Sequence, residues 1–173
     1  MMKPLRVTTA LFLVLSCVAV SLGAAQPHDD KERAELARAL TGTTLPLQRG
    51  VTASAREGKP ISAKYEVEEG TLQLSVYTIK GDTLSEVIVD HTTGKIAKAE
   101  PITKKDDLKA AAAQRATMAK AKRSLSAAAA DAVKANQGFR AVSVMPEMKD
   151  DHPIAEVMLL KGSEWKTVTE KLD

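Results

Sequence analysis

The sequence predicts an α+β fold in which two helix-on-antiparallel-sheet units, each of the order α-β-β-β, are joined by a long helix rich in alanine and lysine. Three observations carry this prediction. Apolar and polar residues alternate over short segments, the stretch 106–137 is rich in Ala and free of Gly and Pro, and similar segments recur at a constant spacing in the two halves. Alternation with period 2 is typical of strands, and alanine has the highest helix propensity.

The first set of strands follows from the alternation. Residues 61–67 place apolar side chains on one face and polar ones on the other, which is the pattern of a strand with one buried face. The apolar-rich segments 72–80 and 84–89 follow after the turns Glu69-Gly70 and Gly81-Asp82. Short turns between such segments predict an antiparallel meander.

The helices are predicted from composition and from their ends. Residues 30–40 form a short amphipathic helix that stops at Gly42. The stretch 106–137 is helical with a break near 122–124, and its first turn carries acidic residues that oppose the positive helix end. Ser124 or Ser126 is the expected cap of the second part.

The second set of strands repeats the first. Residues 141–145, 154–160 and 165–169 are expected to be strands after the helix ends at Gly138, and 75–81 aligns with 156–162. We call the interval from Gly81 to Gly162 the repeat spacing. A duplication is the simplest interpretation. Residues 44–57 should then be the packing helix of the first unit, short or shifted because Gly50 costs about 1 kcal/mol against alanine.

The first 25 residues have the features of a signal peptide. Lys3 and Arg6 precede an apolar run over 10–23, and small residues end it at Ala25. Cys17 also lies in a loose match to a bacterial lipobox, but Leu15 stands where that motif usually has a short residue, so ordinary cleavage is favoured. We therefore expect an exported protein, periplasmic or extracellular in a bacterium. The expected organisation is a signal peptide (1–25), an N-terminal helical segment (26–43), a first unit (44–102), a linker helix (103–123) and a second unit (124–173).

Composition excludes several functions for the mature chain. Cleavage after Ala25 removes Cys17, the only cysteine, and with it any disulfide, thiolate nucleophile or cysteine metal site. The segment also carries 2 of the 25 basic residues and none of the 22 acidic ones, so the remaining charge is nearly balanced and nucleic acid is not an expected partner. No second long apolar run follows, so no transmembrane segment is expected in the mature chain.

Taken with the repeat, the chain resembles the PepSY family, a small module of peptidase propeptides and exported bacterial proteins. The resemblance rests on Gly58, on the strands ISAKYEVEEG and LQLSVYTIKG, and on the ending EVIVDHTTGKI, with a diverged second copy from Leu125. It implies two tandem units with a helix on an antiparallel sheet, no catalytic residues, no cofactor, and the binding or restraint of a partner such as a peptidase. No peptidase domain follows in this sequence, so restraint is expected to act in trans.

Asp90, Thr93 and Gly94 are the fold-signature turn of that ending. The carboxylate should accept hydrogen bonds from the amides of Thr92 or Thr93, and Gly94 should supply a positive φ. His91 is expected to point outward or to lie at the tip of the turn. Because adjacent residues at a strand end diverge, Asp90 and His91 are not expected to form a catalytic pair.

Weak candidates for a metal site are His91 and the turn Asp150-Asp151-His152. Adjacent loop residues rarely converge on one ion without a supporting shell, and a polar hairpin loop is the favoured interpretation. No Gly-x-Ser-x-Gly elbow is present, so a hydrolytic function ranks last. The basic helix 109–123 is interpreted as a solvated spacer rather than as the contact of an acidic partner.

The leading functional hypothesis is therefore a non-enzymatic exported protein that binds a protein or peptide partner through strand edges or through the face between the units. The alternative is a ligand- or metal-binding sensor or buffer of the cell envelope. The sequence leaves the partner and the oligomeric state open.

Overall fold

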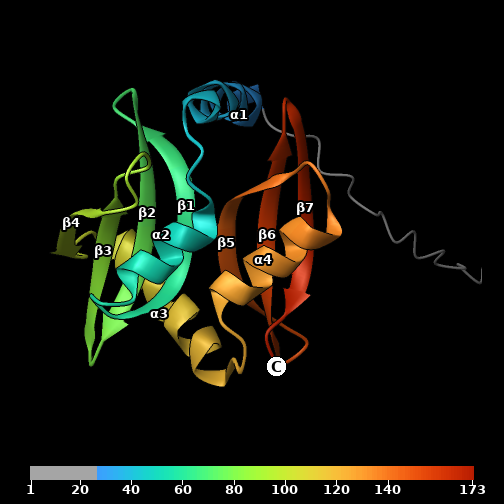
Figure 1. Ribbon diagram of the computed structural model, residues 1–173. Helices are drawn as coiled ribbons and strands as arrows, with labels where there is room; N and C mark the ends of the chain where they lie inside the picture. The colour runs from blue at the N-terminus through green and yellow to red at the C-terminus, as the bar shows by residue number, and fades with distance from the viewer. Residues whose placement is uncertain (1–26) are drawn as a thin grey trace, which may run out of the picture.

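The computed structural model describes residues 27–173, which fold into one α+β body with a seven-stranded antiparallel sheet and four α-helices (Figure 1). The predicted signal peptide, its cleavage site and Cys17 lie outside the described residues. Within the described part, no helix is long and apolar enough to cross a membrane.

All six predicted strands are present, with one further strand after the Asp90 turn. The strands are β1 (Lys59–Glu68), β2 (Thr71–Lys80), β3 (Thr83–Val89), β4 (Ile96–Pro101), β5 (Arg140–Lys149), β6 (His152–Lys161) and β7 (Glu164–Lys171). Their order across the sheet is β4-β3-β2-β1-β5-β6-β7. Both expected meanders are confirmed, but they are not separate sheets: β1 pairs with β5 through Ala63↔Val144 and Lys64↔Ser143.

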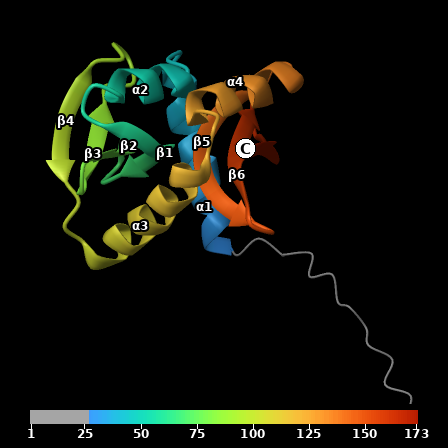
Figure 2. The same ribbon diagram turned by 90° about the horizontal axis from the view of Figure 1, so that it is seen from below.

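The helices lie on both faces of this sheet. They are α1 (Pro27–Ala39), followed by a short 3₁₀ turn η1 (Leu40–Gly42), then α2 (Leu47–Ser54), α3 (Lys105–Lys120) and α4 (Leu125–Ala135). Helices α2 and α4 cover one face and α3 lies on the other (Figure 2). The break expected near 122–124 is confirmed, and Ser124 caps α4 by accepting a hydrogen bond from the amide of Ala127 at 3.1 Å.

Helix α2 is shorter than the expected 44–57 because Pro46, in an extended conformation, stands immediately before its first residue. The packing of α2 against the sheet explains why a glycine stands at position 50. In the sequence, Gly50 is recognisable only as a residue that disfavours a helix. A Cβ at this position would stand 2.2 Å from Cδ2 of Leu74, a fully buried residue of β2. Gly50 therefore lets α2 approach the sheet closely.

The repeat spacing recurs in the backbone of the two halves. It relates the first residues of β1 and β5, of β2 and β6, and of β3 and β7. It also relates the register shifts of the two meanders, which fall between Pro60 and Ser62 in β1 and between Ala141 and Ser143 in β5. The two halves thus place equivalent bulges next to the central pair of strands.

Helix α3 is not the solvated spacer that its basic residues suggest. One side of it is buried against the sheet through Ala111, Gln114, Thr117 and Met118, and the Gln114 carboxamide oxygen accepts a hydrogen bond from the Ser62 hydroxyl at 2.8 Å. Small side chains allow this approach, while basic residues such as Arg115 and Lys120 remain on the exposed side. The spacer interpretation is therefore wrong for the inner half of this helix.

Two basic residues at equivalent strand starts tie the connecting segments to the sheet. Arg140 donates to the carbonyl oxygens of Leu40 (3.1 Å), Thr43 (2.7 Å) and Leu45 (3.1 Å), and its guanidinium lies 5.6 Å from the centre of the Tyr65 ring.

Lys59, the equivalent of Arg140 at the start of β1, donates to the carbonyl oxygen of Met118 at 2.9 Å. Each residue holds the segment that precedes the helix of the other half.

Candidate functional site

The turn after β3 has the expected geometry. Oδ1 of Asp90 accepts hydrogen bonds from the amides of Thr92 (2.9 Å) and Thr93 (2.6 Å) and from the Thr93 hydroxyl (3.0 Å). These bonds, chiefly those from Thr93 and Thr92, lower the pKa of the Asp90 carboxyl. Gly94 has a φ of 71°, and its amide donates to the carbonyl oxygen of Asp90 at 2.8 Å. The carboxylate holds a turn, as predicted.

His91 lies in this turn, which is the second of the two positions expected for it, and its side chain is partly buried. Its Nδ1 is buried and has no hydrogen-bond partner, and its carbonyl oxygen accepts a bond from the Thr43 hydroxyl. The segment before α2 therefore contacts the turn. In the described structure no hydrogen bond or ion pair joins the His91 side chain to Asp90, whose carboxylate bonds to Thr92 and Thr93 instead.

The second polar turn lies between β5 and β6 and contains the other weak candidates for a metal site. Asp150 and Asp151 occupy the turn with φ values of 49° and 63°. His152 instead pairs through Nδ1 with Oδ2 of Asp173 at 2.7 Å, and this hydrogen bond lowers the pKa of the Asp173 carboxyl. Within residues 27–173, no three His, Cys, Asp or Glu side chains converge in a way that could hold a metal ion. Sequence reasoning missed Asp173 because it lies far along the chain from His152.

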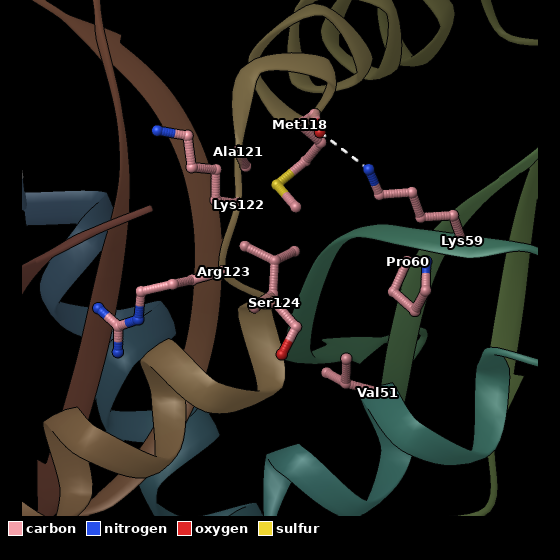
Figure 3. Close-up of a pocket in the computed structure, with 9 residues that line it drawn as sticks. Val51, Lys59, Pro60, Met118, Ala121, Lys122, Arg123 and Ser124 are labelled. Atoms are coloured by element: carbon pink, nitrogen blue, oxygen red, sulfur yellow. Dashed lines mark hydrogen bonds between the residues drawn. The ribbon is translucent and has the colours of Figure 1, made fainter. Parts of the chain in front are cut away.

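A pocket of about 230 Å³ lies where α2, β1 and the α3–α4 connection meet (Figure 3). Its interior is apolar and is formed by residues such as Val51, Pro60 and Met118. Lys59 bonds to the Met118 carbonyl at its rim, while the side chains of Lys122 and Arg123 point away from it. Arg123 turns toward β7, where it bonds to the carbonyl oxygen of Lys171 at 2.6 Å.

The two outer strands of the sheet differ in how open they are. β4 is short, ends at Pro101, and carries a register shift opposite Ile88 and Val89. Short length, a bulge and proline are devices that protect a sheet edge from pairing. β7 is longer, contains no proline, and pairs with β6 in an unbroken register. The edge of β7 is therefore the less protected one.

Hydrogen bonding shows which backbone groups β7 presents at this edge. The amide of Leu172, a fully buried residue directly after β7, donates to the carbonyl oxygen of Pro153 at 2.9 Å. Inward and outward groups alternate along an antiparallel strand, so the even-numbered residues of β7 bond to β6. The outward amides and carbonyls belong to the odd-numbered residues Trp165, Thr167, Thr169 and Lys171, and of these the Lys171 carbonyl is already bonded to Arg123.

This outward edge is the candidate functional site. Thr167 and Thr169 are exposed, and no strand among the described residues pairs with their backbone groups. The burial of Leu172 and the pair between His152 and Asp173 hold the end of β7 in place. Local sequence carries no sign of this site, because an unpaired backbone edge depends on strand order rather than on side chains. No family model, curated protein or solved structure matches the chain.

Proposed function

We propose that this chain is a non-enzymatic exported protein of two PepSY-like units that binds or restrains a protein or peptide partner, such as a peptidase of the cell envelope. The repeat spacing between strand starts and between bulges supports two related units. In this proposal the units share one sheet through β1 and β5, and α3 connects them. The fold-signature turn at Asp90 belongs to the first unit, and residues 124–173 contain no equivalent of it.

The outer edge of β7 is the observation that carries the binding role. In this proposal the outward amides and carbonyls of Trp165, Thr167 and Thr169 pair with an added strand. The outward carbonyl of Lys171 already accepts a hydrogen bond from Arg123, so the added strand pairs upstream of it. An extended segment of a partner would extend the sheet there, and backbone hydrogen bonds would supply affinity with little dependence on sequence. Peptidase restraint fits this mode, since extended segments are also what a peptidase accepts.

The test removes one outward amide while leaving the strand in place. Thr169→Pro removes an N–H that faces the open edge and keeps every bond from β7 to β6. Thr169→Val has a similar shape and retains the N–H, so it is the matched control. The mature chain, residues 26–173, and both variants are added to purified exported peptidases of the same organism, and hydrolysis of a fluorogenic peptide is followed.

We expect the parent chain and Thr169→Val to lower the activity of at least one peptidase, and Thr169→Pro to lose this effect. Circular dichroism checks that the proline variant remains folded. Equal inhibition by all three proteins would show that the partner binds elsewhere. No change in any peptidase would remove peptidase restraint as the function.

A further inference from the structure

The internal repeat identifies an unfilled strand position beside β7. In the first half of the chain, β3 has β4 on its outer side. In the second half β7 occupies the place of β3, since the repeat spacing separates their first residues, Thr83 and Glu164. No described strand lies where an equivalent of β4 would pair. Among residues 27–173, the second half of the sheet therefore has no counterpart of β4.

The sequence of β7 is complementary to itself when two copies pair antiparallel about Val168. In this register Lys166 of each copy lies opposite Glu170 of the other, and Thr167 lies opposite Thr169. Residues directly opposite have Cβ atoms about 4.5–5.5 Å apart, so each Lys–Glu pair is within reach of an ion pair. A symmetric arrangement offers two such pairs. They would compete with the contacts these side chains already make, since Lys166 donates to the Asn136 carboxamide oxygen at 2.6 Å and Glu170 lies 3.9 Å from Arg123.

The backbone selects the same register. Thr167 and Thr169 both point their amides and carbonyls outward, so they exchange hydrogen bonds across the two copies. Val168 then faces its own equivalent as a non-hydrogen-bonded pair. A shift of the axis to Thr167 would instead place Glu164 opposite Glu170, which is unfavourable because the charges are alike.

We infer that a second copy of this chain occupies the edge of β7, giving a symmetric dimer with one continuous sheet through both protomers. The contact is a strand edge rather than a broad face, so the dimer is weak and forms at high micromolar concentration. The dimer would cover the same backbone groups of β7 that the proposed partner binds. The inference shares this edge with the proposed function and rests on it in no other way. Dimer and partner complex then exclude each other.

The decisive experiment uses cysteine cross-linking, since the mature chain has no cysteine of its own. In Val168→Cys the two Cα atoms would lie about 4.5 Å apart, within the range of about 4.4–6.8 Å that a disulfide needs. In the control Glu164→Cys, the cysteines lie well away from the axis, on opposite sides of it. Their separation is about 27 Å at about 3.4 Å per residue, too far for a disulfide.

We expect mild oxidation to cross-link Val168→Cys into a covalent dimer and to leave Glu164→Cys without a cross-link. Sedimentation of the uncrosslinked parent chain should show a monomer–dimer equilibrium that Thr169→Pro abolishes and Thr169→Val retains. A parent chain that stays monomeric up to near-millimolar concentration would overturn the inference, as would equal cross-linking of both cysteine variants.

The outcomes also separate this inference from the proposed function. If the chain is monomeric but Thr169→Pro still loses its effect on a peptidase, the dimer is wrong and partner binding at β7 stands. If the dimer forms through Val168 while no peptidase responds, the edge serves self-association and peptidase restraint is wrong.

Discussion

The close approach of Gly50 to Leu74 predicts the effect of Gly50→Ala on the free energy of unfolding. The substitution should destabilise the parent chain but stabilise a Leu74→Ala variant. Glycine to alanine in a helix normally stabilises by about 1 kcal/mol. Here the new Cβ would stand 2.2 Å from Cδ2 and 3.0 Å from Cγ of Leu74. Leu74 is fully buried, so it has no solvent into which it can rotate. We expect the clash to exceed the gain in helix propensity.

The magnitude follows from the two opposing terms. Overpacking a core costs about 1–3 kcal/mol, and so deep an overlap belongs in the upper part of that range. Subtracting about 1 kcal/mol of helix propensity leaves a net destabilisation of about 1–2 kcal/mol. For a chain of this size that lowers Tm by about 2–8 °C.

The assay is a double-mutant cycle measured by urea and thermal unfolding. Leu74→Ala alone should cost about 2–5 kcal/mol, because it leaves a cavity under α2. In that background the clash is gone, so Gly50→Ala should now stabilise by about 1 kcal/mol. Gly42→Ala is the control, since a Cβ there meets nothing within 4 Å. Equal destabilisation by Gly50→Ala in both backgrounds would refute the reasoning, and so would stabilisation in the parent chain.

Three further predictions concern the contacts that fix the loops. Arg140→Met should cost about 2–3 kcal/mol, because three carbonyl oxygens lose a charged donor; Arg140→Lys should recover only part of this in thermal unfolding, and full recovery would contradict the role of the guanidinium fork. Gly94→Val should destabilise more than Gly70→Val, since both have positive φ but only Gly94 would also press on Leu45, at 3.1 Å; equal urea midpoints would refute this. Asp90→Ala should lower the urea midpoint at pH 7. Because folding depresses the pKa of this carboxyl, its contribution is present above the unfolded pKa of about 3.9 and is lost as pH falls through the lower folded value. The difference from the parent should therefore shrink in acid, and a constant difference down to pH 2 would contradict it.

Local patterns predicted the elements because their causes are local. Alternation over a few residues predicted the strands, and the alanine-rich stretch predicted α3 and α4 with the break that Ser124 caps. The Asp90 turn was also predictable, since its hydrogen bonds join residues that are near neighbours in the chain. β4 was not predicted, and most of its residues are exposed, so it lacks a buried face to produce alternation.

The candidate site was outside the reach of such patterns. His91 and His152 attract attention in the sequence, yet one has a buried Nδ1 and the other pairs with Asp173. The edge of β7 has no distinctive residue type. Which strand is outermost depends on how distant segments pair. The residues of the strand alone do not determine that pairing.

The sequence by itself predicted six of the seven strands, the helical stretches with shifted ends, the Asp90 turn and the recurring spacing of the two halves, since each depends on propensity, alternation or bonds between near neighbours. Only the tertiary structure decided that both meanders form one sheet through Ala63 and Val144, that α3 packs on its face, and that β7 is an open edge. Pairing between residues so distant in the chain depends on backbone register and on the fit of whole faces. The sequence of a single strand determines neither its register nor the fit of its face.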